Sequence, residues 1–410
     1  MHIKELTIQA FNEYTKNSPL KNYMQTEMYA RLMGENKYNY DYIGLLDENN
    51  TIVAVSLILK KRIGLNMLYG YAPKGFLVNY YNEKLLKIFT QKLKDFYSKK
   101  GMVFIKINPE IVVNTIDNNT FESNVNPNIK LKEDLKKYGF IKLKDNIYFE
   151  AIEPRFNAYI DLKKHKFENY SKTNRNKVRN AKRKGLYIAQ GNENDLEAFY
   201  NLLNTKKTLK FYQNYYSIFE KNDNIDLILV KVNFEKFIKN SQDLYEDEVN
   251  YNNLLNEILH RSHKEEDLHK KMASDSRLCT IKNEIVFATE GLRNHNDEVI
   301  AGALVVKYDN RVHIVASGYD KKYSNLNSNY YLFDQIIENY KYDYDYLDLN
   351  GIVGDFKNDN PYSGLNRFKL GFNPNIYEYI GEFDLIFNKT NYDYLRASGK
   401  LAQEFNKKED

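Results

Sequence analysis

One order of predicted elements occurs twice in this chain, on either side of a charged segment, and this recurrence restricts the fold more than any other feature. Each copy has two neighbouring strands, a helix with apolar residues at helical spacing, and a further strand. A chain of 410 residues is also too long for one ordinary core. The sequence therefore predicts a duplicated α+β fold in two domains. The copies comprise residues 40–46, 51–60, 82–99 and 102–107, and residues 298–308, 311–318, 328–340 and 346–349.

Other elements are predicted around these copies. Gly139 and Gly185 follow segments with helical periodicity, so each is expected to end a helix. The further helices are predicted over residues 131–138, 167–184 and 195–210, and the further strands over residues 156–162, 186–190 and 278–292.

The segment between the copies differs from both. Residues 233–277 are highly charged and contain neither Pro nor Gly, and their apolar residues form a sparse stripe at helical spacing. The stripe is interrupted at residues 261–266, where a helical hairpin would turn. Two interpretations remain open: an arm that reaches a nucleic acid or a partner, and a solvated helical insertion. The stripe consists of Leu244, Tyr251, Leu255, Ile258, Leu268 and Met272.

Composition excludes several classes of protein. A single cysteine, Cys279, rules out an intramolecular disulfide and a cysteine-rich metal cage, and fits a reducing cytosol. His260 and His263 lie on a polar segment with no third ligand nearby, so no metal site is expected. The first residues do not resemble a signal peptide, and the longest apolar run, residues 52–59, is far too short to span a bilayer. We expect a cytoplasmic protein.

The predicted helix that begins near Ser171 is strongly basic. Residues 171–184 include seven Lys or Arg residues and no acidic residue. Like charges three or four residues apart on a helix repel, so a solvated helix normally mixes both signs. A polyanion, either tRNA or phospholipid headgroups, would explain this face, and the alternative is a basic face without a partner. The side chains on one side of the helix are Lys172, Arg175, Arg179, Lys182 and Arg183.

Six strings, in order over nearly the whole chain, resemble the Fem family of non-ribosomal peptidyltransferases. The C-terminal ones carry the strongest similarity: Leu349-Asn-Gly-Ile-Val-Gly354, Phe368-Lys-Leu-Gly-Phe372 and Tyr379-Ile-Gly-Glu-Phe-Asp384. The others are Met24-Gln-Thr-Glu-Met-Tyr29, then Tyr71-Ala-Pro-Lys-Gly75 with residues 102–109, and residues 153–162 with the basic segment 171–185.

This resemblance implies a fold of two acetyltransferase-like domains with an inserted antiparallel coiled-coil arm. The first domain is then expected over residues 1–155 plus about 380–410, the second over residues 156–232 plus 278–379, and the arm over residues 233–277. The implied activity is transfer of an amino acid from aminoacyl-tRNA to a stem-peptide amine of a peptidoglycan precursor, which builds the interpeptide bridge of the cell wall. Aminoacyl-tRNA is the activated co-substrate, so no cofactor is expected.

The implied reaction is aminolysis of an ester, which needs no Ser or Cys nucleophile because the ester is already a good acyl donor. The protein has to align the amine with the ester and to stabilise the oxyanion of the tetrahedral intermediate. By resemblance, Lys369 supplies the cation for the oxyanion and Phe368 shapes the channel where the two substrates meet. The alternatives are a lysine flanking a strand and a core phenylalanine. The substrate-binding candidates are Lys74, Tyr215, Tyr216 and Arg367.

Several positions depart from the family pattern. Tyr29 stands where the family usually has Trp, and Met33 where a lysine would bind a substrate phosphate. Phe211 replaces an arginine ahead of the tyrosine pair, and Asn108 stands where Asp is common. The usual tyrosines of one strand are replaced in residues 313–317. These departures favour a lipid-linked precursor over a UDP-linked one, with peripheral contact at the inner face of the membrane.

Two other classes of function remain open. A coenzyme A-dependent N-acyltransferase would need a glycine-rich turn that feeds a helix N-terminus, and the nearest glycine pair, Gly351 and Gly354, has no basic residue before it. A non-enzymatic RNA-binding or membrane-scaffold protein would explain the basic helix and the arm. It would leave the Phe368-Lys369 string unexplained.

Overall fold

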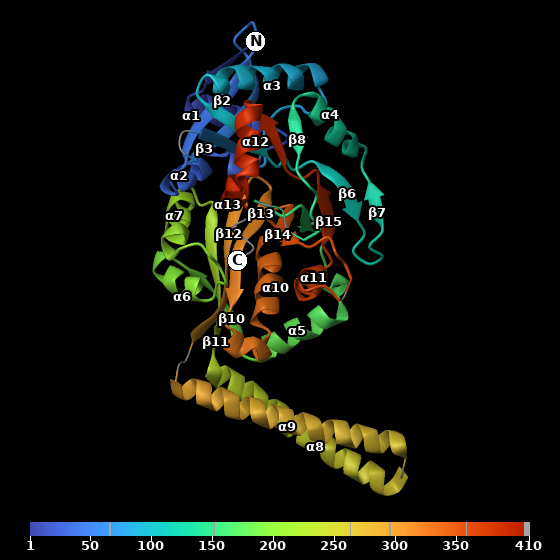
Figure 1. Ribbon diagram of the computed structural model, residues 1–410. Coiled ribbons are helices and arrows are strands. Elements are labelled where there is room, and N and C mark those ends of the chain that lie inside the picture. The colour runs from blue at the N-terminus through green and yellow to red at the C-terminus, as the bar shows by residue number, and fades with distance from the viewer. Residues whose placement is uncertain are drawn as a thin grey trace.

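The computed structural model describes residues 1–64, 67–148, 150, 152–262, 264–294, 297–357 and 359–405. The described residues form two β-sheets with helices packed on them and a long helical hairpin that projects away from both (Figure 1). His263, one of the two histidines considered as a metal ligand, lies outside the described residues.

The first sheet has the strand order β1-β2-β3-β4-β5-β16-β8. Its neighbouring strands are antiparallel, except for β4 and β5, which run parallel. The strands are β1 (His2–Glu5), β2 (Asn39–Leu46), β3 (Ile52–Ile63), β4 (Met67–Ala72), β5 (Met102–Ile107), β8 (Phe140–Lys142) and β16 (Phe383–Ile386).

The second sheet has the strand order β10-β11-β12-β13-β14-β9-β15-β6-β7, and its parallel pair is β13 and β14. The strands β6 and β7 come from the first part of the chain, although they pair in this second sheet. The strands are β6 (Val112–Ile116), β7 (Ser123–Val125), β9 (Phe156–Asp161), β10 (Leu186–Gly191), β11 (Ile225–Val232), β12 (Glu298–Tyr308), β13 (Arg311–Tyr319), β14 (Tyr346–Ile352) and β15 (Asn375–Tyr379).

The two sheets share one topology. In each, an antiparallel run of strands is followed by a helix and by a strand that returns parallel to the last one: α3 (Glu83–Ser98) connects β4 to β5, and α10 (Ser328–Tyr340) connects β13 to β14. This arrangement confirms the predicted duplicated α+β fold.

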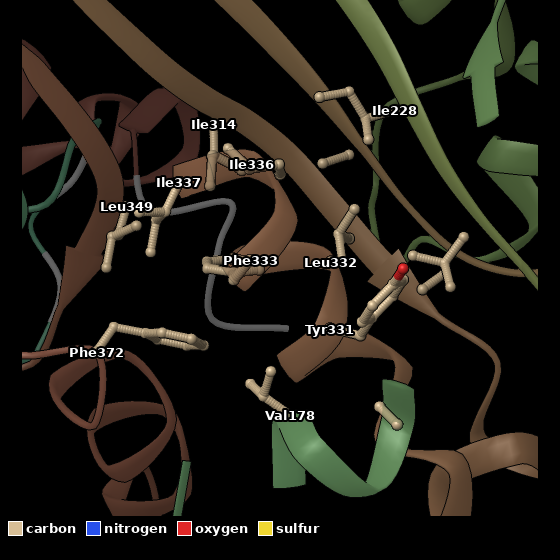
Figure 2. Close-up of a cluster of buried hydrophobic side chains, with 14 of the residues drawn as sticks. Val178, Ile228, Ile314, Tyr331, Leu332, Phe333, Ile336, Ile337, Leu349 and Phe372 are labelled. Atoms are coloured by element: carbon tan, nitrogen blue, oxygen red, sulfur yellow. The ribbon is translucent and has the colours of Figure 1, made fainter. Parts of the chain in front are cut away.

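The helices cover the sheets with their apolar faces. Figure 2 shows how α10 places Leu332, Phe333 and Ile336 against the second sheet, with Val178 of the basic helix beside them. Outside the projecting hairpin, the other α-helices are α1 (Ile8–Asn17), α2 (Glu27–Glu35), α4 (Leu131–Lys137), α5 (Lys172–Arg183), α6 (Leu196–Asn201), α7 (Leu209–Glu220), α11 (Ser363–Leu370), α12 (Lys389–Ala397) and α13 (Lys400–Phe405).

Two helix predictions need correction. The helix predicted over residues 195–210 ends with α6 at Asn201, and a separate helix, α7, begins at Leu209, where the Thr208 hydroxyl accepts from the backbone N of Phe211 at 3.3 Å. The helix predicted over residues 167–184 begins later, at α5, where the Ser171 hydroxyl accepts from the Asn174 backbone N at 3.2 Å. In both places a hydroxyl side chain supplies a local acceptor at a helix N-terminus, which starts a new helix.

The projecting hairpin is longer than predicted. It consists of α8 (Phe234–Ser262) and α9 (Glu265–Asn294), so the strand predicted over residues 278–292 is wrong: these residues are the C-terminal half of α9 (Figure 1). Within this part of α9, Ile281 is buried and Ala288 joins the core of the second sheet with Phe287 packed against it, whereas Val286 is exposed. Tertiary packing has overridden a local strand preference here.

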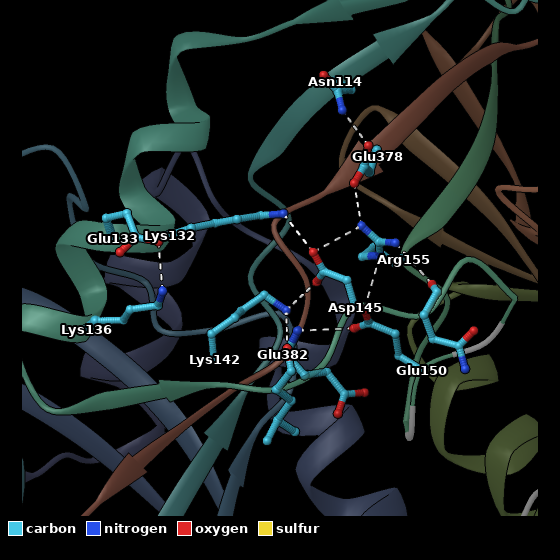
Figure 3. Close-up of polar contacts among 12 residues, drawn as sticks. Asn114, Lys132, Glu133, Lys136, Lys142, Asp145, Glu150, Arg155, Glu378 and Glu382 are labelled. Carbon is cyan, nitrogen blue, oxygen red and sulfur yellow. Dashed lines mark hydrogen bonds and ion pairs between the residues drawn. The ribbon is translucent and has the colours of Figure 1, made fainter.

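The end of the chain returns to the first sheet. Strand β16 pairs with β5 and β8, and α12 and α13 follow it. A network of charged side chains holds this return near the segment that joins the two sheets (Figure 3). Its centre is Arg155, which forms ion pairs with Glu378 and, at 3.1 Å, with Glu150. No helix within the described residues is both long and apolar enough to cross a membrane.

Candidate functional site

The ends of the parallel strands position the first group of polar side chains. Strands β4 and β5 end together, at the register pair of Ala72 and Ile107, so the residues after them lie at one edge of the first sheet. Lys74 follows β4 and Asn108 follows β5, and the Asn108 side-chain oxygen accepts from the Lys74 backbone N at 2.9 Å. The edge therefore presents a lysine on a tightly held turn.

The second sheet contributes from its own parallel pair. Strands β13 and β14 are paired through three residue pairs only, the last being His313 with Asp348. The His313 Nδ1 lies 3.3 Å from an Asp348 carboxylate oxygen. Asp348 also accepts from the Asn350 backbone N at 2.7 Å and is 3.4 Å from the Asn157 side-chain nitrogen. Burial tends to raise the pKa of Asp348, but the hydrogen bonds from His313 and from the Asn350 backbone, together with the charge of Lys74, outweigh it and the pKa is lowered.

One carboxylate joins these two groups. Glu110, after β5, lies 3.5 Å from the Lys74 Nζ and 3.4 Å from an Arg311 guanidinium nitrogen on β13. Lys74 is 7% exposed, and the Tyr379 ring lies 5.9 Å from its ammonium. Burial opposes the charge of Lys74, but the Glu110 carboxylate and more distant carboxylates raise its pKa. A cation from each sheet thus shares one partly buried counter-ion.

Lys369 lies beside this cluster, on a helix, whereas the alternative considered for it was a lysine flanking a strand. It is near the end of α11, and its Nζ donates to the Gly351 carbonyl oxygen of β14 at 2.7 Å. Its side chain is 9% exposed. Burial lowers the pKa of Lys369 to about 8, and the nearby Asp348 carboxylate acts in the opposite direction. An ammonium has three donors, so two remain beyond the bond to Gly351.

The neighbours of Lys369 point elsewhere. The Phe368 ring packs at 4.8 Å from Phe333 and 5.5 Å from Phe372, between centroids, and so belongs to the core of the second sheet. This contact corresponds to the core alternative for Phe368. Arg367 is exposed on the outer side of α11.

The two tyrosines of α7 face different surroundings. Tyr215 is buried, and its hydroxyl is hydrogen-bonded to that of Tyr23, whose ring in turn lies 4.9 Å from the His313 ring. Tyr216 is half-buried, and burial together with the Glu220 carboxylate raises its pKa. The structure therefore brings Tyr215, but not Tyr216, to the junction of the sheets.

Only some of the cations on the basic helix α5 are exposed and available to bind an anion. Lys182 forms an ion pair with the buried Asp334 at 2.8 Å, and Arg183 pairs with Glu284 of the hairpin at 3.2 Å. Arg175 donates to the Glu168 carbonyl oxygen at 2.8 Å. Lys172 and Arg179 are exposed. The face predicted from spacing is thus divided between internal ion pairs and exposed cations.

Sequence reasoning did not single out Glu110, Arg311 or Asp348. Each lies beside a parallel strand pair, and the pairing of distant strands is not visible in local sequence patterns. The string Asn108-Pro-Glu110 could have indicated Glu110. Its proline ends β5 and so places the next polar side chain at the edge of the sheet.

A largely buried set of cations, carboxylates and a histidine at the junction of two sheets of one topology is typical of an enzyme that binds an anionic substrate and moves a proton. The family comparison then gives the identification: the FemAB family model matches residues 6–400, so the chain belongs to the FemAB family.

Similar proteins support this assignment. The chain is 21% identical to the aminoacyltransferase FemA of Staphylococcus aureus over 396 residues, covering 92% of this chain and 93% of that protein. It is also 21% identical to the aminoacyltransferase FemA of Staphylococcus epidermidis over 400 residues, with 92% and 94% covered. The crystal structure of FemX matches the fold with a TM-score of 0.72 at 18% identity, covering 96% of this chain and 100% of that one.

Proposed function

We propose that this protein is an aminoacyltransferase that moves an amino acid from aminoacyl-tRNA to a stem-peptide amine of a peptidoglycan precursor, and so builds the interpeptide bridge. The observation that carries the proposal is the family match over residues 6–400, together with FemA relatives that cover nearly the whole chain. The reaction would take place in the cytoplasm, at or near the inner face of the membrane, where charged tRNA and a lipid-linked precursor meet.

Lys369 is proposed as the cation that stabilises the oxyanion. Its ammonium is buried, held by one hydrogen bond to a carbonyl, and close to Asp348. In a site of low dielectric constant, a cation fixed before the reaction is worth more than one that has to reorganise from water. Phe368 supports this role indirectly, because its packing in the core fixes the turn of α11 that carries Lys369.

Lys74 and Arg311 are proposed to bind the phosphates of the precursor. They approach one carboxylate from two sheets, and a diphosphate carries more negative charge than Glu110 and more acceptor oxygens. Tyr215 is proposed to line the same junction. Arg367 and Tyr216 would contact more distant parts of a substrate.

The exposed part of α5 is proposed to contact tRNA or anionic headgroups. Lys172 and Arg179, with Arg175 between them, keep three cations on one side after Lys182 and Arg183 have formed internal pairs. Electrostatic contacts of this kind weaken as salt is added.

Reconstitution tests the proposal. The purified full-length protein is mixed with total charged tRNA and lipid II, and the product is measured by mass. An added amino-acid residue on the stem peptide supports the proposal, and parallel reactions with the UDP-linked precursor identify the preferred acceptor. Transfer from an acyl-coenzyme A mixture, with none from charged tRNA, would contradict it.

A further inference from the structure

A buried histidine and a buried aspartate form a pair at the junction of the sheets. His313 is 4% exposed, and its Nδ1 lies 3.3 Å from an Asp348 carboxylate oxygen. The other ring nitrogen, Nε2, is buried and has no hydrogen-bond partner within the described part of the chain. Buried polar atoms are nearly always satisfied, so an unpaired one in an interior site calls for a ligand or a role.

The Asp348 carboxylate determines which ring nitrogen of His313 carries the hydrogen. Two donors, the Asn350 backbone N and the Asn157 side chain, approach the other oxygen of Asp348, and the carboxylate is in its ionised form. An ionised carboxylate can only accept, so the Nδ1 of neutral His313 bears the hydrogen and donates it. The lone pair of the imidazole is then on Nε2.

A small cavity lies beside His313. His313 lines a cavity of about 30 Å³, enough for one water or one amine nitrogen, between the first-sheet loop at Lys21 and the β12–β13 hairpin. The Tyr23 ring packs 4.9 Å from the imidazole, between centroids, on the first-sheet side. The Asp348 carboxylate interacts with both His313 and Lys369. It is hydrogen-bonded to His313, and its negative charge acts on the Lys369 ammonium.

We propose that His313, oriented by Asp348, is the general base that takes the proton from the acceptor amine and returns it to the leaving ribose oxygen. The proposal rests on the proposed aminoacyl transfer. Lys369 and His313 then divide the work: the ammonium faces the oxyanion, and the imidazole handles the proton.

The step balances as follows. The neutral amine nitrogen forms a bond to the ester carbonyl carbon, and the carbonyl oxygen becomes an oxyanion. Nε2 removes one proton from the attacking nitrogen. The carbonyl re-forms as the carbon–oxygen bond to the ribose breaks, and the imidazolium gives its proton to that ribose oxygen. The products are an amide and tRNA with a free hydroxyl, and His313 ends neutral.

Other charged and titratable groups surround the histidine, and any pH dependence includes them. They are Asp348 on β14, Tyr23 on the 3-10 helix over Tyr23–Gln25, Lys21 with its partner Asp309 at 3.0 Å, and Arg311 on β13.

The test compares His313→Gln with a matched control, His165→Gln. Glutamine keeps a donor toward Asp348 but cannot take up a proton. His165 is a second histidine whose Nε2 lacks a partner within the described residues, and it packs on Tyr170, away from the junction. Single-turnover transfer from charged tRNA is measured from about pH 6 to pH 9, with an acceptor whose aminooxy nitrogen stays unprotonated throughout.

We expect His313→Gln to slow transfer by about 100-fold or more at neutral pH, and to remove the rise in rate on the acid side of the pH profile. His165→Gln should have the wild-type rate and the wild-type pH profile. A folded His313→Gln protein with the wild-type rate and profile would overturn the inference alone. Absence of transfer by the wild-type protein would overturn the proposed function and this inference together.

A second measurement covers the case in which His313→Gln does not fold. Combining Lys369→Met with Glu150→Gln removes the two groups whose pKa values burial places within this range, so an acid-side rise that remains in the residual rate belongs to the base. Persistence of that rise supports His313 as the base, and a rate that does not change with pH overturns it.

Discussion

The two sheets have one topology, but their parallel strand pairs differ. In the first sheet, β4 and β5 stay paired up to the ends of both strands, at Ala72 and Ile107. In the second, β13 and β14 part after His313 and Asp348, although both strands continue. Beyond this point side chains make the contacts: the Asn350 side-chain nitrogen donates to the Ile314 carbonyl oxygen of β13 at 3.4 Å, and the Gly351 carbonyl oxygen accepts from Lys369.

Two buried lysines, one packed against each sheet, have different partners. Lys106 of β5 is 2% exposed and lies 2.9 Å from Asp384 and 3.6 Å from Glu382, so two carboxylates compensate its charge. Lys369 has a carbonyl as its direct partner, and burial lowers its pKa. A compensated lysine stabilises the fold, whereas an uncompensated one retains the capacity to stabilise a new negative charge.

The two sheets therefore share a fold, but only the second carries the cluster around Lys369. The first sheet is completed by β16 and the helices after it, with the Phe405 ring 4.7 Å from the Lys106 ammonium. The second sheet keeps its parting strands beside the cluster of Asp348 and Lys369. We therefore expect substitutions in the first sheet to act mainly on stability and those in the second mainly on turnover.

The largest expected effect is that of Lys106→Met on stability. The change leaves Asp384 and Glu382 buried without their cation, which costs about 3–5 kcal/mol of unfolding free energy. Urea denaturation measures it, with the exposed Lys99→Met as the control. Unchanged stability with a collapse in turnover would show that the first sheet also holds reacting groups.

Lys369→Met should reduce turnover and leave stability nearly unchanged. The methionine stem fills much of the same space while the charge is removed, so we expect kcat to fall by about 100-fold or more, or about 3 kcal/mol, with little change in KM or unfolding free energy. Steady-state kinetics with charged tRNA and lipid II check this, again beside Lys99→Met. Near-normal turnover by the folded variant would remove Lys369 from the chemistry.

Glu150, between the two sheets, allows a test by pH. Burial raises the pKa of Glu150 to about 7, and although Arg155 lies 3.1 Å away, the pair lacks hydrogen-bond geometry. A carboxyl whose pKa is raised by folding stabilises the folded state when protonated, and this contribution disappears as pH rises through about 7.

We therefore expect Glu150→Gln to become more stable than the wild type above pH 7, by on the order of 2–3 kcal/mol, and similar to it near pH 4. Melting temperatures across this range measure the difference, with the exposed Glu133→Gln as the control. If the melting temperatures of Glu150→Gln and the wild type differ by the same amount at every pH, the raised pKa of Glu150 is contradicted.

The smallest expected effect concerns the outer helices of the two sheets. Reversing Lys172, Arg175 and Arg179 of α5 to Glu should weaken tRNA binding and lower its salt slope by about 0.7–0.9 for each phosphate that the helix no longer neutralises. Three lysines of α3 reversed together, Lys84, Lys87 and Lys94, form the matched control on the first sheet. Filter binding at several salt concentrations checks this, and equal slopes for the two triple variants would show that α5 is merely solvated.

Local patterns predicted much of the fold. The hairpin over β2 and β3, the helix α3, and the strands β5, β12 and β13 were found because their apolar residues recur with the period of a strand or a helix and because turn residues bound them. The string of residues 368–372 drew attention to Lys369. The strand predicted over residues 278–292 failed because a run of β-branched and apolar residues suits a buried helix as well, and long-range packing decides between the two.

The sequence by itself determined which segments form elements, that the chain is a duplicated α+β protein, and that a lysine near residue 369 belongs to its most family-like string. Only the tertiary structure decided that a cluster forms at the junction of the sheets. It brings together Glu110, Arg311, His313, Asp348, Lys74 and Lys369. The reason is physical: residues more than 200 positions apart, such as Glu110 and Arg311, become neighbours through strand pairing and sheet packing, and no local spacing encodes those contacts.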